Sequence, residues 1–332
     1  MSRAEGRSRA TLAALAVVWL AVLCIGPAIG SQDVSLTDLF SEDSATRTII
    51  WRLRMPRVLL GLLAGGALAI GGVAFQTLFR NPLAEPYTLG LASGAALGAV
   101  VVQHLELAGS AAGFPLVSVA SFAGAVLVGL LILGLARGRG GIETSTLLLA
   151  GIAVSLSCSA FILFIQYLAD FTRTFRMVRW MMGGLAVVGY REVVWVGLWT
   201  AAGFTALFLL RRDLDQLLTG EELASSRGVD LDRLRLLVLA AVSGMVGALV
   251  AVAGPIGFVG LVVPHILRRW IGHHHLALLP ASLLGGGAFL ALCDLAARRV
   301  LAPMELPVGI LTALLGGPFF LWLLLSRRRR RG

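Results

Sequence analysis

The sequence predicts an all-α polytopic membrane protein with about ten transmembrane helices. Apolar residues make up 58% of the 332-residue chain and charged residues only 14%, and the mean hydropathy is +0.88. Apolar runs of about 20 residues recur along the chain, each long enough to cross a hydrocarbon core of about 30 Å. One soluble core in a chain of this size cannot bury all of these runs.

Hydropathy places ten spans along the chain. Their bounds are 11–30, 57–78, 87–105, 115–136, 146–169, 191–210, 234–254, 256–271, 276–297 and 305–325. The first span follows several arginines, as in a signal peptide, but its apolar run is longer and further spans follow, so we expect a retained helix. We predict one transmembrane domain over 1–332, with a first half of about 1–190 and a second half of about 191–326.

Arginine placement predicts the orientation. With the N-terminus in the cytoplasm, the inside segments hold more arginines than the outside segments, as membrane proteins prefer. The basic tail from Arg327 to Arg331 then places the C-terminus in the cytoplasm as well. An even number of spans is consistent with both ends on one side.

Residue types absent from the chain exclude several chemistries. All 28 basic residues are arginine, so the chain has neither a phosphate-binding P-loop lysine nor a Schiff-base lysine. An ATP-driven function would therefore need a separate ATPase chain. The three cysteines, Cys24, Cys158 and Cys293, lie inside predicted spans at no metal-ligand spacing and are predicted to be small buried apolar residues. We expect no metal site and no bound cofactor.

Residues 66–94 carry the most distinctive pattern. A glycine-rich apolar helix passes through Gln76 into a polar turn over 81–86, and two prolines in that turn stop helices. Gly90, Gly94 and Gly98 then recur every four residues, which forms a stripe that another helix can approach closely. The pattern predicts a hinge between close-packed helices, with an ordinary helical hairpin as the alternative.

Two external segments are rich in arginine. Arg54 and Arg57 stand at the mouth of the second span, after a polar loop over 31–56, and Pro56 suits the start of a helix. They either anchor the helix at the interface or dock an acidic partner. In 170–190, three arginines at three-residue spacing predict a short amphipathic interfacial helix.

The largest cytoplasmic loop, 211–233, predicts two short helices over 213–228. Thr219 with Glu222 fits a capping box, and Gly228 fits a helix stop. Such a pair would offer a partner both apolar and acidic groups, whereas a solvated connector is the alternative. In the second half, 247–265 weakly parallels 66–82, which suggests two inverted pseudo-repeats.

Taken together, the motifs resemble the FecCD-type permease family, the membrane subunits of type II ABC importers for iron–siderophores, haem and cobalamin. The matching segments are 54–57, 76 with 81–86, 89–90, 147–151, 257–265, 294–298, 305–309 and 317–319. The chain departs from the family pattern at Gly183-Gly184 and at His273-His274-His275. Three adjacent histidines do not share a helix face, so they do not predict a metal site.

The resemblance implies a permease with the ABC permease fold that pairs with a second copy or a paralogous permease in a bacterial inner membrane. Two ABC ATPase subunits, which bind ATP and Mg²⁺, would lie below it and a soluble substrate-binding protein above; no nucleic acid is expected. The implied docking residues are Arg54, Arg57 and Arg298. The implied ATPase-coupling residues are Asp213, Asp215, Thr219, Gly220, Glu221, Glu222, Arg227 and Gly228. The implied gate and pathway residues are Gln76, Asn81, Pro82, Leu83, Pro86, Thr144 and Ser145.

The expected mechanism is alternating access rather than enzymatic catalysis. A ferric siderophore is the favoured cargo because it is the commonest in the family, with haem or cobalamin as alternatives. A secondary transporter would need a site for a coupling ion, but Glu106, Glu143, Asp170 and Asp294 all lie at span ends. We predict that Asp294 pairs with Arg298 on the surface of one helix and relays no protons.

Overall fold

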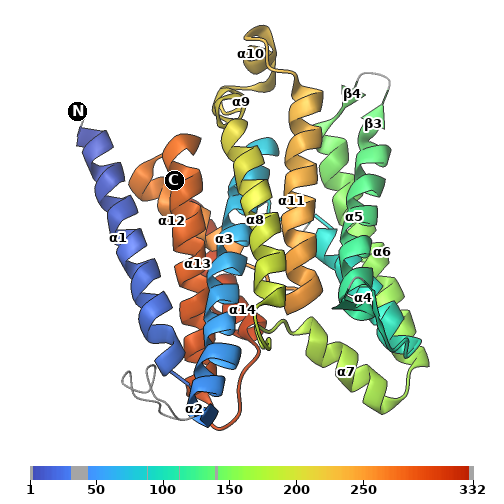
Figure 1. Cartoon of the computed structure of the whole chain (residues 1–332). Helices are drawn as coiled ribbons and strands as arrows, with labels where there is room; N and C mark the ends of the chain where they lie inside the picture. The colour runs from blue at the N-terminus through green and yellow to red at the C-terminus, as the bar shows by residue number, and fades with distance from the viewer. Residues whose placement is uncertain (1–2, 31–43, 88, 112, 139–140, 329–332) are drawn as a thin grey trace.

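The computed structural model describes residues 3–30, 44–87, 89–111, 113–138 and 141–328. These residues form a bundle of long helices, with only two-residue strands beside it (Figure 1). The first half contains α1 (Arg3–Ile25), η1 (Gly26–Ala28), α2 (Ser44–Thr48), η3 (Ile49–Arg54), α3 (Met55–Leu78), α4 (Leu91–His104), β1 (Ser110–Ala111), β2 (Phe114–Pro115), α5 (Leu116–Ala136), β3 (Arg137–Gly138), β4 (Gly141–Ile142), α6 (Thr144–Leu168) and α7 (Phe171–Met181). The second half contains α8 (Arg191–Leu209), α9 (Arg211–Leu217), α10 (Glu221–Ser226), α11 (Leu231–Ala253), α12 (Val259–Ile271), α13 (His275–Val300) and α14 (Val308–Arg328).

Every predicted span coincides with a helix, but the helices differ in length. Within the described part of the chain, seven helices are long and apolar enough to cross a membrane. In contrast, α4 has 14 residues and α12 has 13, which at about 1.5 Å per residue gives roughly 20 Å. The predicted spans 87–105 and 256–271 are therefore too long, because each starts in a non-helical segment that precedes the helix.

Helix α3 lies at the centre of the bundle. It packs against α13, α12, α8 and α11, and its small residues are buried along most of its length. By contrast, α1 and α6 expose most of their apolar surface, as expected of helices that face lipid. The apolar run 57–78 is thus the core of the protein as well as a span.

Glycine allows unusually close helix contacts at several places, among them Gly72 and Gly98. At Gly72 of α3, a side chain would overlap the backbone carbonyl of Gly260 in α12. At Gly98 of α4, a side chain would overlap the carbonyl of Ala120 in α5. The predicted glycine stripe on α4 is therefore a helix-packing surface, with α5 as the neighbour.

The two ends of the bundle carry different short elements (Figure 1). At one end lie α9, α10 and the β3–β4 hairpin, near the N-terminus, and α7 lies at the opposite end. Helix α7 confirms the predicted amphipathic segment; it starts at Asp170, whose carboxylate accepts the backbone N–H of Arg173 at 2.9 Å.

Two local predictions need correction. The predicted polar loop 31–56 is helical from Ser44 onward, as α2 and the π-helical η3 lead directly into α3; its portion 31–43 lies outside the described residues. Cys158 and Cys293 are buried, but Cys24 is exposed on α1, because this outer helix turns only one side to the bundle. The β1–β2 and β3–β4 pairs have no pattern long enough to predict.

Candidate functional site

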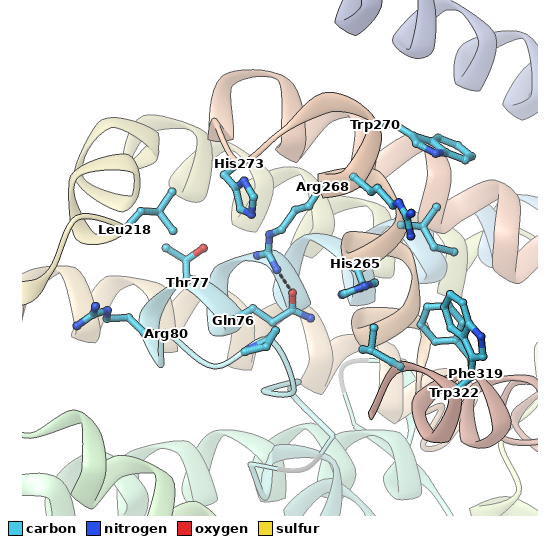
Figure 2. A pocket seen from close by; sticks show the side chains of 14 residues that line it. Gln76, Thr77, Arg80, Leu218, His265, Arg268, Trp270, His273, Phe319 and Trp322 are labelled. Atoms are coloured by element: carbon cyan, nitrogen blue, oxygen red, sulfur yellow. Dashed lines mark hydrogen bonds between the residues drawn. The ribbon is translucent and has the colours of Figure 1, made fainter. Parts of the chain in front are cut away.

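A cavity of about 920 Å³ lies where the end of α3 meets α12 and α14 (Figure 2). Its polar lining is basic, since three arginines and two histidines contribute to it, and none of the described lining residues is a carboxylate. Three aromatic side chains, Trp270, Phe319 and Trp322, form part of the wall. The basic residues are Arg80, His265, Arg268, Arg269 and His273. Such a lining can hold an anion that also has an apolar or aromatic body.

Gln76 joins two walls of this cavity. Its side chain is 4% exposed, its amide nitrogen donates to the Gly260 carbonyl at 3.0 Å, and its amide oxygen accepts from the Arg268 guanidinium, as Figure 2 shows. Arg268 also donates to the carbonyl of Val73 at 3.4 Å. One polar residue within an apolar helix thus ties α3 to α12 and directs an arginine along the cavity wall.

The predicted turn after α3 is present and folds back on the bundle. Arg80 has a positive φ of 45°, and the Asn81 side chain accepts the Leu83 backbone N–H at 3.0 Å. Pro86 is buried, close to Gly71 in the middle of α3. Pro82 lines the cavity, so the turn forms part of its wall.

Glu85, in the same turn, has a buried carboxyl group that the sequence analysis did not single out. Its side chain is 4% exposed and is hydrogen-bonded to the backbone of Phe258. Phe258 precedes α12 with a φ of 70°, so the turn and the start of α12 hold each other in place. Glu85 escaped notice because it stands between two prolines in a segment that looks exposed.

The second predicted gate segment, Thr144 and Ser145, begins α6. Neither residue is among the described residues that line the cavity. The hydroxyl of Thr144 instead donates to Glu221 of α10 at 2.8 Å, and Ser145 donates to the neighbouring Glu143. The structure therefore joins Thr144 to a predicted coupling helix rather than to the described cavity lining.

Glu221 also connects α10 to α11. Its carboxylate lies 2.7 Å from Nη2 of Arg235, whose Nη1 donates to the Ile142 carbonyl at 2.6 Å. Partial burial would raise the pKa of Glu221, but the hydrogen bonds from Arg235 and Thr144 outweigh burial and lower it. The negative charge of Glu221 thus holds α6, α10 and α11 together at this end of the bundle.

The two short helices predicted over 213–228 are present as α9 and α10, but the capping box is wrong. The Thr219 hydroxyl donates back to the carbonyl of Gln216 at 2.7 Å, and α10 begins after Gly220, whose φ of 123° favours glycine. Gly228, with φ of 88°, follows the end of α10 as predicted. Asp213 lies in α9, Glu222 lies in α10, and Arg227 directly follows α10.

Asp215 of α9 faces the start of α13. Its carboxylate accepts the backbone N–H of His275 at 2.9 Å and lies 2.6 Å from the Nδ1 atom of the same residue. Partial burial would raise the pKa of Asp215, but the hydrogen bonds from the side chain and backbone of His275 outweigh burial and lower it. The carboxylate therefore fixes α9 on α13.

The predicted external arginines have partners within the chain. Asp294 accepts from Arg57 of α3 at 2.9 Å and from Nε of Arg298 at 2.8 Å, and Arg57 also reaches Glu305 at 2.6 Å. Asp294 and Arg298 are both 2% exposed, so their predicted pairing is present but buried rather than on a helix surface. The contact of Asp294 with Arg57 was not predicted, since α3 and α13 are far apart in sequence.

Arg54 lies one turn before Arg57. Its guanidinium donates to the carbonyls of Pro27 and Ala28, at 3.3 and 3.2 Å. It thus closes the end of η1 against the start of α3. Arg54 is half-buried, whereas Trp51, Arg52 and Leu53 are exposed beside it.

The membrane-length helices, the buried central helix and the basic cavity define a polytopic helical membrane protein. The chain belongs to the FecCD transport family, whose model matches residues 15–326. This membership confirms the family resemblance carried by the sequence motifs.

Named relatives and a solved structure cover nearly the whole chain. A vitamin B12 import system permease protein, BtuC of Shigella boydii serotype 18, is 40% identical over 96% of this chain and 95% of its own. The hemin transport system permease protein HmuU of Yersinia pestis is also 40% identical, over 95% of each chain. A putative metal-chelate type ABC transporter in an inward-facing conformation matches with a TM-score of 0.83 and 29% identity, over 96% of this chain and 99% of that one. The fold is that of an ABC permease.

Proposed function

We propose that this chain is the membrane-spanning subunit of an ATP-driven importer that brings a bulky metal chelate into the cytoplasm. The observation that carries the proposal is the 40% identity, over almost the whole chain, to permeases of vitamin B12 and hemin import. A vitamin B12-type or haem-type chelate is accordingly the proposed cargo, in preference to the ferric siderophore that the resemblance alone favoured.

The cavity supports a large anionic cargo. Its volume of about 920 Å³ falls near the upper end of ligand pockets, roughly 300–1,000 Å³. Arginine binds carboxylate and phosphate groups through paired N–H donors, and haem carries carboxylates while cobalamin carries a phosphate. The aromatic wall residues Trp270, Phe319 and Trp322 provide flat surfaces for a macrocycle.

The mechanism in this proposal is alternating access driven by a partner ATPase. The chain has no lysine, so a P-loop must come from another polypeptide. Helices α9 and α10 would receive the motion of two ATPase subunits, which bind the ATP and Mg²⁺. The turn at 81–86 and the start of α6 at Thr144 and Ser145 would gate the exit.

The remaining partners are also proposals. A second copy of the chain, or a paralogous permease, would complete the pathway, and a soluble binding protein would deliver the cargo to the outer face. Arg54, Arg57 and Arg298 are the docking candidates. Asp294 already forms ion pairs with both Arg57 and Arg298. A docking protein would therefore contact Arg54 and Arg57 first, while Arg298 would hold the cluster in place. Both termini would lie in the cytoplasm of a bacterial inner membrane.

The test is uptake by cells that lack this gene, supplied separately with cobalamin, haem and ferric siderophores. We expect loss of uptake of one chelate, restored by the wild-type gene only when the partner ATPase is also present. Unchanged uptake of all three chelates in a strain without redundant importers would contradict the proposed cargo. Restored uptake without the ATPase would contradict ATP coupling.

A further inference from the structure

Three polar side chains form a hydrogen-bonded chain that reaches the cavity wall: His275 and Thr77 are buried, and Asp215 is partly buried. His275, the first residue of α13, is fully buried and uses both ring nitrogens. Its Nδ1 lies 2.6 Å from Asp215 of α9, and its Nε2 lies 2.9 Å from the hydroxyl of Thr77 of α3. Thr77 is 1% exposed. No local sequence pattern distinguishes His275 from its neighbours His273 and His274.

The proton positions determine which group donates in each of these hydrogen bonds. The Asp215 carboxylate can only accept, so Nδ1 of His275 must donate to it. The Thr77 hydroxyl has one proton, and it is also 2.9 Å from the Val73 carbonyl one turn earlier. If that proton points to Val73, then Nε2 must donate to Thr77; if it points to His275, then Nε2 accepts it. In either case, each of these polar groups keeps its hydrogen-bond partner only while Asp215, His275 and Thr77 keep their relative positions.

These contacts connect α9 with the cavity wall, and a coupling motion must pass from one to the other. Asp215 belongs to α9, one of the two short helices that the proposed ATPase contact uses. Thr77 follows Gln76 on α3 and lines the cavity itself (Figure 2). His275 connects them through α13, the helix that packs most extensively on α3. Displacement of α9 therefore acts on the cavity wall through the two side-chain hydrogen bonds of His275.

We propose that Asp215, His275 and Thr77 form a relay that transmits movement of α9 to the end of α3, so that ATP hydrolysis is coupled to the opening of the cavity. The proposal rests on the proposed function of the chain as a transport subunit. All three act as positioning residues, because they set the relative placement of α9 and the cavity wall. Loss of either hydrogen bond, to Asp215 or to Thr77, would let α9 move while α3 stays in place.

The direct test uses this chain reconstituted in liposomes with its partner ATPase and binding protein. Thr77→Val and His275→Phe keep side-chain size while removing the bonds. We expect each to lower the amount of chelate transported per ATP hydrolysed by at least about fivefold, the lower end of coupling between sites. ATP hydrolysis itself should continue, and Thr77→Ser should restore the ratio because it restores the hydroxyl.

Two matched variants separate coupling from stability. Thr200 of α8 is also buried and also donates to the carbonyl four residues earlier, at 2.7 Å, so Thr200→Val is the control for Thr77→Val. His274 is 89% exposed, and its Nδ1 lies 3.8 Å from the Asp215 carboxylate. His274→Ala is therefore the control for the histidine, because it removes this exposed ion pair and leaves the Asp215–His275–Thr77 contacts in place. A purely structural role would lower hydrolysis and transport together with folded yield and leave their ratio unchanged.

A second measurement does not depend on transport. Amide hydrogen exchange of the isolated chain in detergent should be faster across α9 in Asp215→Asn and His275→Phe than in the wild type, and unchanged in His274→Ala. Unchanged exchange across α9, or an unchanged transport-to-ATP ratio in both relay variants, would overturn the relay. Absence of ATP-dependent transport by the wild-type complex, with faster α9 exchange in the variants, would instead overturn the proposed function.

Discussion

Asp294 is the residue on which charge balance between the start of α3 and the end of α13 depends. It lies between two arginines, Arg57 and Arg298, and is almost fully buried. Removing one member of a buried ion pair leaves the other charge without compensation in a medium of low dielectric constant. The two arginines then repel each other where α3 and α13 meet.

We therefore expect Asp294→Asn to destabilise the folded chain by about 3–5 kcal/mol, the range for a broken buried pair. Thermal unfolding of the purified chain in detergent measures this loss. Glu305→Gln is the control, because Glu305 contacts the same arginine but is 42% exposed and should cost little. Equal midpoints for Asp294→Asn and wild type would show that the cluster contributes nothing to the fold.

In the cavity, Arg268 is the charged residue whose role can be tested by substitution. Its guanidinium is held by Gln76 and faces a lining with no carboxylate among its described residues. We expect Arg268→Gln to reduce uptake of an anionic chelate by at least about tenfold, since one charge-assisted hydrogen bond contributes roughly 1.5–3 kcal/mol. The measurement is initial uptake rate at matched protein levels, with Arg179→Gln on the exposed side of α7 as control. Equal losses in both variants would contradict a specific role.

Single residues of the site were predictable only where they stand out within their own segment. Gln76 interrupts an apolar helix, and the Asn81 turn contains two prolines, so both were visible. Arg268 resembles any arginine at a span end, and His275 resembles its two neighbours. What distinguishes them is contact with α3 and α9, which are distant in sequence, and no local pattern records such contacts.

At the scale of elements, glycine positions control how closely the helices pack. Gly98 touches the α5 backbone, whereas nothing lies near Gly134 of α5. We expect Gly98→Ala to destabilise the chain by about 1–3 kcal/mol, because the new methyl overpacks the α4–α5 contact. Gly134→Ala should be neutral or slightly stabilising, since alanine favours helix. Thermal midpoints in detergent test the difference, and equal midpoints would show that α4 and α5 can separate without cost.

The attachment of α9 and α10 should respond to acid in a defined direction. The pKa values of Asp215 and Glu221 are both lowered in the folded chain. Their stabilisation is therefore complete above the ordinary values of about 4 and is lost as the pH falls through the lowered values. We expect the difference in thermal midpoint between wild type and Asp215→Asn to be constant from pH 8 to 5 and to shrink below about pH 4. A difference that shrinks between pH 8 and 6 would contradict this assignment.

The elements themselves were largely predictable, and their ends were not. Composition and run length predict every long helix, because a membrane helix must be apolar over its whole length. The starts of α4 and α12 were misplaced because buried apolar residues, such as Leu89 and Ile256, lie outside the helix just before each start. The Thr219 capping box failed because the hydroxyl bonds to the turn that ends α9, and Gly220 then starts α10.

At the scale of the whole molecule, the site is a product of topology. The cavity combines the end of α3 with α12 and α14, and the relay adds α9 and α13. Sequence motifs predict the family and therefore this topology, but the basic lining and the buried relay follow only from the assembled bundle. The inverted relation of the two halves stays a prediction.

The most direct test of the transport function is uptake by proteoliposomes that contain this chain, its partner ATPase and its binding protein. We predict that cobalamin or haem enters only when ATP is present on the ATPase side and that proton and sodium gradients have no effect. Uptake that follows an imposed ion gradient in the absence of the ATPase would contradict the proposal and identify a secondary transporter.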